Sequence, residues 1–147
     1  MIQTNSDGGA RGNPGPGAIG VIVRRENEIL IRYSGGIGQR ITNNQAEYEA
    51  LIKALELAIK VKDKEVECFL DSELVVKQLL GEYKVKNPIL LQSFLKVQKL
   101  IENFDKIKFT HVSRWDTYQQ IADELLNNEL DSLGYGRYRG YKGTLGS

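Results

Sequence analysis

Four carboxylates stand where the sequence changes from one kind of element to the next. Asp7 and Asp71 each end a predicted strand, and Glu47 and Asp123 fall in the predicted first turn of a helix. Each acid alone is explained as a solvated carboxylate or as a partner of a helix dipole. As a group they would repel one another unless a divalent cation lay among them, and oxygen ligands favour hard ions such as Mg²⁺ or Mn²⁺. The group therefore predicts a divalent metal site.

Zinc and thiol chemistry find little support in the composition. The sequence has one histidine, His111, and one cysteine, Cys68, which are too few for a zinc site. Cys68 lies in the apolar run CFL, so we expect a small buried hydrophobe, and a lone cysteine excludes an internal disulfide. This cysteine usage favours a reducing, cytoplasmic setting.

A glycine-rich stretch begins at the first acid. Residues 7–17 read DGGARGNPGPG, which is typical of a tight loop between strands. Backbone N–H groups in such a loop can approach a phosphate, so an acid beside it would bring a metal ion and a phosphodiester together. An ordinary glycine-rich β-hairpin explains the same residues, and this stretch alone does not distinguish the two.

Hydrophobic periodicity predicts the elements that must position these residues. Runs of β-branched or alternating residues indicate strands, and apolar residues at helical spacing indicate helices. Asn87 and Pro88 are typical of a helix cap and the first helical position. The predicted strands cover residues 2–7, 18–25, 28–36, 64–70 and 106–112. The predicted helices cover residues 43–60, 71–81, 88–103 and 121–133, with an irregular segment over residues 113–120.

The order of these elements predicts an α/β fold. The first three strands form antiparallel hairpins, whereas the strand–helix–strand connections that follow give parallel pairing. We therefore expect a mixed five-stranded sheet, with three antiparallel and two parallel strands and helices on both faces. If the first and fourth strands are parallel neighbours, Asp7 and Asp71 lie side by side.

Length and charge set the broad class. A chain of 147 residues that is 41% hydrophobic fits one domain with a substantial core. Its formal net charge of +1 means that any nucleic-acid surface must be a local patch. No apolar run approaches the ~20 residues of a membrane span, and no signal peptide is visible, so we expect no membrane association.

The last residues differ from the rest. Residues 134–147 are rich in glycine, tyrosine and arginine and lack an apolar period, so we expect a domain over residues 1–133 and a flexible tail beyond it. The cations Arg137, Arg139 and Lys142 suit a nucleic-acid surface, but a tail without a role explains them as well.

Four segments resemble ribonuclease H of type 1, in the same order. They are DGGARGNPGPGAIG at residues 7–20, TNNQAEYEAL at 42–51, DSELVVKQLLGEYKVKNP at 71–88, and HV-x-R with AD-x-L at 111–125. The resemblance covers residues 1–133. It implies a ribonuclease H-like fold and hydrolysis of the RNA strand of RNA–DNA hybrids by a monomer that uses two Mg²⁺ ions, with Mn²⁺ as a substitute.

The same resemblance implies roles for individual residues. The metal-binding and catalytic acids would be Asp7, Glu47, Asp71 and Asp123. The positions that match substrate-contacting residues carry amide, hydroxyl or backbone groups suited to phosphate and ribose oxygens: Gly8, Asn13, Thr42, Asn43, Asn44 and Gln45. Asn43 and Asn44 suit helix caps equally well.

Two features depart from the family pattern. The link GEYKVKN is too short for the basic protrusion of familiar bacterial members, so the chain resembles the branch without a protrusion, as in archaeal and some bacterial members. His111 falls on a strand instead of the loop that often carries a mobile histidine, so that role is not transferred. The link from Arg114 to Asp123 is also longer by about two residues, which makes Asp116 the second candidate for the fourth acid.

Two other functions fit the same sequence less well. A catalytically weak or inactive nucleic-acid-binding domain would result if the longer link misplaced Asp123. Another nuclease on this fold, such as a 3′–5′ exonuclease, is disfavoured by the TNN-x-AE-Y-x-AL segment.

Overall fold

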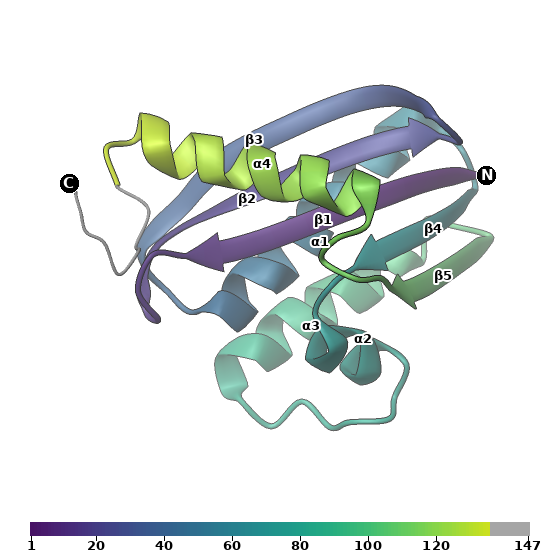
Figure 1. Ribbon diagram of the computed structural model, residues 1–147. Helices are drawn as coiled ribbons and strands as arrows, with labels where there is room; N and C mark the ends of the chain where they lie inside the picture. The colour runs from purple at the N-terminus through teal and green to yellow at the C-terminus, as the bar shows by residue number, and fades with distance from the viewer. Residues whose placement is uncertain (136–147) are drawn as a thin grey trace.

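A mixed sheet with the strand order β3-β2-β1-β4-β5 forms the centre of the computed structural model, which describes residues 1–135 (Figure 1). β1, β2 and β3 pair antiparallel, while β4 pairs parallel with β1 and β5 parallel with β4. The strands are β1 (Ile2–Ala10), β2 (Gly15–Arg25), β3 (Glu28–Ile41), β4 (Glu65–Leu70) and β5 (Lys106–His111). The predicted fold class is confirmed.

Helices cover both faces of this sheet (Figure 1). The helices α1 (Asn43–Val61), α2 (Glu73–Leu79) and α3 (Pro88–Ile101) share one hydrophobic core with the sheet, and α4 (Thr117–Ser132) crosses the opposite face. The main core is built from fully buried side chains such as Ile2, Leu51, Leu55 and Val66. The apolar cluster under α4 is small, consisting of Ala18, Leu126 and Leu130 with Tyr135 packed against it.

Side-chain caps fix where α1 and α3 begin. Thr42 and Gln45 form a capping box, in which the Gln45 N–H donates to Thr42 Oγ1 at 3.1 Å and the Thr42 N–H to Gln45 Oε1 at 2.8 Å. Asn87 Oδ1 accepts hydrogen bonds from the backbone N–H groups of Ile89 and Leu90. These caps hold the starts of both helices, and the predicted cap and proline of α3 are confirmed.

The glycine-rich stretch is mostly strand. β1 continues through Gly8 and Gly9 to Ala10, and β2 begins at Gly15, so residues 11–14 alone lie between the two strands. Asp7 is therefore inside β1, where it pairs with Gly20, and the prediction that it ends the strand is wrong. Glycine accepts extended backbone as readily as turns, so the composition did not show where the loop began.

α4 begins earlier than its apolar pattern indicates. The segment over residues 113–120 is helical from Thr117, with Asp116 as the N-cap. The first turn contains Gln119, which is fully buried although polar. An apolar period could not reveal a turn whose inward side chain is an amide.

Cys68 and the start of the predicted tail are both packed. Burial raises the pKa of the Cys68 thiol to about 12, so this thiol is a buried hydrophobe, as predicted. Tyr135 donates its N–H to the Leu130 carbonyl at 2.9 Å and its hydroxyl to Gln39 Oε1 at 2.8 Å. The rest of the predicted tail, residues 136–147, lies outside the described residues. Within residues 1–135, no helix is long and apolar enough to span a bilayer.

Candidate active site

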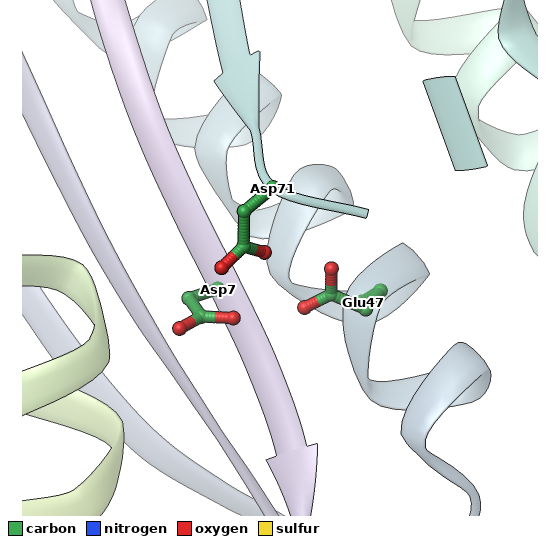
Figure 2. A group of neighbouring side chains, drawn as sticks. All are labelled: Asp7, Glu47 and Asp71. Atoms are coloured by element: carbon green, nitrogen blue, oxygen red, sulfur yellow. The ribbon is translucent and has the colours of Figure 1, made fainter. Parts of the chain in front are cut away.

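Three of the predicted acids point toward one another from different elements. Asp7 comes from β1, Glu47 from α1, and Asp71 from the residue that follows β4 (Figure 2). One carboxylate oxygen of each lies within 4.8 Å of the others. Asp7 and Glu47 are both buried, with 7% of each residue exposed. The three acids are far apart in the sequence, and the fold brings them together.

Strand register brings Asp7 and Asp71 together. β1 and β4 run parallel, with Asn5 opposite Phe69, and each acid lies two residues farther along its strand direction. The two carboxylates therefore leave adjacent backbones at the same level of the sheet. The prediction that they lie side by side is confirmed.

A close approach of α1 to β1 positions Glu47. A Cβ on Gly8 would overlap the carbonyl group of Ala46, so only glycine lets the helix come this near. The Gly8 N–H then donates to Glu47 Oε1 at 2.7 Å. Because Thr42 is the N-cap, Glu47 lies in the second turn and not in the predicted first turn, so it is no ordinary partner of the helix dipole.

Burial raises the pKa of all three acids, and repulsion from neighbouring acids, which for Asp71 is the repulsion from Asp123, adds to that rise. For Asp7 and Glu47 the main cause is burial and the next is the charge of a neighbouring acid, and the pKa of Glu47 rises to about 8. Burial also raises the pKa of Asp71, while the nearby Arg114 guanidinium opposes that rise. A divalent cation would offset the cost of charging these carboxylates, and a set of carboxylate oxygens fits Mg²⁺ or Mn²⁺.

Of the two candidates for the fourth acid, Asp123 lies at the cleft. A cleft of about 660 Å³ is lined by the three acids and by Asp123. Asp123 lies in the second turn of α4, since the helix begins at Thr117, and not in the first turn as predicted. The Asp116 carboxylate instead accepts hydrogen bonds from the N–H groups of Tyr118 and Gln119 at 3.1 and 3.0 Å. Asp116 is therefore a helix cap.

A buried polar network fixes α4 against the sheet. Gln119 donates to the Ser6 carbonyl at 2.8 Å and accepts from Asn5 Nδ2 at 3.1 Å. Arg24 donates to Asn5 Oδ1 at 3.0 Å and its guanidinium lies 3.9 Å from the centroid of the Tyr118 ring. Ser6 is the neighbour of Asp7, so the network ties the start of the helix that bears Asp123 to the strand that bears Asp7. Sequence reasoning did not identify this network, because its partners lie far apart in the sequence.

Most of the predicted substrate-contacting side chains hold the protein's own backbone. Asn13 Oδ1 accepts the Asn43 N–H, and Asn43 Oδ1 accepts the Ala10 N–H, each at 3.0 Å. Thr42 and Gln45 are engaged in the capping box, and the Gly8 N–H is engaged by Glu47.

Asn44 differs from the other residues of this set. Its side chain makes no hydrogen bond within residues 1–135, and it lines both the acidic cleft and a neighbouring cleft of about 470 Å³. Asn44 is thus the amide of the set that is most available to a ligand.

Residues outside the predicted set of site residues also line the acidic cleft. Arg114 and Trp115 lie at the cleft between β5 and α4, and His111, the last residue of β5, lines it as well. Their position at or just after the end of a strand next to β4 was the signal that could have identified them, because strands β4 and β5 are parallel and end together.

Comparisons with known proteins agree with this geometry. A family model described as reverse transcriptase-like matches residues 5–128. A ribonuclease HI of Halobacterium salinarum is 43% identical over 131 residues, which are 88% of this chain and 64% of that protein. A bifunctional protein of Mycobacterium tuberculosis is 41% identical over 134 residues, which are 89% of this chain and 36% of that protein. The chain thus spans less than two thirds of these two relatives.

One solved structure is similar to this chain over nearly the whole length of that structure. The crystal structure of LC11-RNase H1 in complex with an RNA/DNA hybrid has a TM-score of 0.84 and 42% identity, and the match covers 90% of this chain and 99% of that one.

Proposed function

The chain belongs to the ribonuclease H family, and on that premise we propose that it hydrolyses the RNA strand of RNA–DNA hybrids. The observation that carries the proposal is the convergence of the buried Asp7 and Glu47 with the half-buried Asp71, whose ligand oxygens all lie within 4.8 Å of one another. The related LC11 enzyme, which was solved with a hybrid, supports the substrate.

Two divalent cations, Mg²⁺ in the first instance and Mn²⁺ as a substitute, fit this site. When bound, such ions lower the pKa of a water nucleophile and stabilise charge on the attacking and leaving oxygens. Asp7, Glu47 and Asp71 would hold them, with Asp123 as the fourth acid at the cleft. The backbone positions of these acids are well suited to binding metal ions, because Asp7 and Glu47 lie inside regular elements and Asp71 directly follows β4.

Other residues of the cleft would bind and orient the substrate. Asn44 offers an unengaged amide between two clefts, where it can reach the ribose or phosphate oxygens of a bound strand. The hydrogen-bonded set around it, Asn13, Thr42, Asn43 and Gln45, would keep that amide in place and would itself lie against the substrate. A 2′-hydroxyl is the chemical feature that would mark the RNA strand.

The alternative of an inactive binding domain is not favoured by the position of Asp123. It depended on a misplaced Asp123, and Asp123 lines the same cleft as the other acids. We further propose a monomer in a reducing cytoplasm, which size-exclusion chromatography and localisation of the tagged protein would test.

The experiment that tests the function uses labelled duplexes. We expect Mg²⁺-dependent cleavage of the RNA strand in an RNA–DNA hybrid, and little or none of a DNA duplex of the same sequence. Double-stranded RNA is the second control. Equal cleavage of all three duplexes, or cleavage only from a 3′ end, would contradict the proposal.

A further inference from the structure

Trp115 stands at the catalytic cleft with most of its surface in solvent. It is the single tryptophan of the sequence, and with 69% exposed it is the most exposed large hydrophobic side chain among residues 1–135. Its indole contributes nothing to the two hydrophobic clusters of the fold. Packing of the hydrophobic core therefore does not explain why a tryptophan occupies this position.

The backbone that carries Trp115 is firmly held. The Trp115 N–H donates to Ser113 Oγ at 3.1 Å, and the Asp116 N–H to the Ser113 carbonyl at 3.0 Å. On one side the Val112 N–H donates to the Leu70 carbonyl, next to Asp71, and on the other side Asp116 caps α4. The fold therefore sets the backbone position from which this exposed indole projects at the cleft.

A cation lies against one face of the ring. The guanidinium carbon of Arg114 is 5.0 Å from the centroid of the Trp115 ring, a cation–π contact. Arg114 is the one arginine or lysine among the described residues that line the cleft, whose other charged members are acids. The pair thus offers a positive group and a free aromatic face beside the site for the scissile phosphate.

We propose that Arg114 and Trp115 form a binding site for the cleaved strand next to the scissile phosphate. The inference rests on the proposed function and deepens it. The Arg114 guanidinium would bind a neighbouring phosphate, and the open face of the Trp115 indole would pack on the adjoining ribose. Phosphate contacts position a strand, and aromatic faces accept sugars and bases without regard to sequence. The site would therefore add affinity for any sequence.

Because Trp115 is the single tryptophan, its fluorescence reports on this place alone. The test titrates the Asp7→Asn variant, which should bind without cutting, with an RNA–DNA hybrid in Mg²⁺. Anisotropy of a dye on the DNA strand follows binding independently. We expect tryptophan emission to change and saturate at the same hybrid concentration as the anisotropy.

Steady-state kinetics provide the second readout. Trp115→Ala should raise KM about fivefold to tenfold, in the lower part of the range for aromatic stacking, and leave kcat within about twofold. Trp115→Phe, which keeps an aromatic face, should recover most of that loss. Leu95→Ala is the matched control, because Leu95 is 57% exposed on α3 and does not line the cleft.

The outcomes separate this inference from the proposed function. Hybrid binding by anisotropy with unchanged tryptophan emission would overturn the Arg114–Trp115 site and leave the function intact. An unchanged KM for Trp115→Ala would do the same. Absence of both hybrid binding and cleavage in the wild-type protein would overturn the proposed function itself.

Discussion

Gly20 on β2 and Ala122 on α4 approach so closely that a Cβ on Gly20 would overlap the Ala122 carbonyl oxygen. The next residue along α4 is Asp123. The same relationship recurs on the other side of the sheet, where Gly8 leaves room for the Ala46 carbonyl, one residue before Glu47. Both helix-borne acids thus follow the point where their helix lies nearest to a strand glycine.

This relationship predicts that Gly20→Ala lowers both stability and activity. The added methyl group must push α4 outward, which costs about 1–3 kcal/mol of unfolding free energy and moves Asp123 away from the other acids. We expect a lower Tm and a fall in kcat at saturating substrate. Gly9→Ala is the control, because its nearest neighbour would be a Leu126 methyl at 3.7 Å, an ordinary contact. Equal activity of the two variants would mean that α4 need not lie so close.

Substitutions of Asp116 and Asp123 should have different effects, the first on stability and the second on catalysis. Asp116→Ala removes a cap that accepts two backbone N–H groups, so we expect a loss of about 1 kcal/mol in unfolding free energy with kcat nearly unchanged. Asp123→Asn should reduce kcat severely in Mg²⁺ with little change in Tm. Thermal denaturation and single-turnover cleavage measure the two effects. The opposite pattern would make Asp116 the fourth acid.

Substitutions of Asn44 and Thr42 should likewise affect different properties, substrate binding for Asn44 and stability for Thr42. Asn44→Ala deletes an amide that makes no hydrogen bond within residues 1–135, so we expect a higher KM and an unchanged Tm. Thr42→Ala breaks the capping box of α1 and should cost about 1 kcal/mol of stability, seen as a lower Tm. An unchanged KM for Asn44→Ala would remove that amide from the substrate surface.

Local rules were sufficient for the parts of the fold that bury apolar side chains or use common caps. The helix over residues 43–60 and the cap at Asn87 follow from periodicity and from a proline at the first helical position. Parallel pairing of β1 and β4 follows from crossover connections, and it brings Asp7 beside Asp71.

Features that depend on tertiary contacts could not be predicted this way. The first turn of α4 is held by the amide of Gln119, which is buried only because Asn5 and the Ser6 carbonyl bind it. Glu47 reaches the site because α1 lies close to Gly8 on β1, whose N–H donates to the Glu47 carboxylate. No local pattern reports such partners, because they are distant in the sequence.

The raised pKa values predict that the metal-free protein loses stability as the pH rises. A carboxyl whose pKa is higher in the folded state binds more protons there than in the unfolded state. Its contribution to the free energy of unfolding is therefore complete at a pH below the unfolded pKa, and it is lost as the pH rises through the folded pKa. For Glu47 this window extends from an unfolded pKa of about 4.3 to a folded pKa of about 8.

Thermal denaturation in the presence of a chelator tests whether stability falls as the pH rises. The Tm of the wild-type protein should fall between these pH values, the Tm of Glu47→Gln should fall less, and Mg²⁺ should restore the wild-type Tm at the higher pH. A Tm difference between the two proteins that does not change with pH would show that Glu47 is not protonated in the metal-free site.

The central claim is that Asp7, Glu47 and Asp71 hold the metal ions that cleave the hybrid. Glu47→Gln tests it most sharply, because glutamine keeps an oxygen that can accept the Gly8 N–H and loses only the negative charge. The measurement is the single-turnover rate of RNA-strand cleavage in saturating Mg²⁺, for the wild-type protein and this variant. We expect a loss of at least about a thousandfold with binding of the hybrid retained and a metal-free Tm at least as high as that of the wild type, since one member of a repelling cluster is neutral. Cleavage by Glu47→Gln at a rate near that of the wild type would contradict the account.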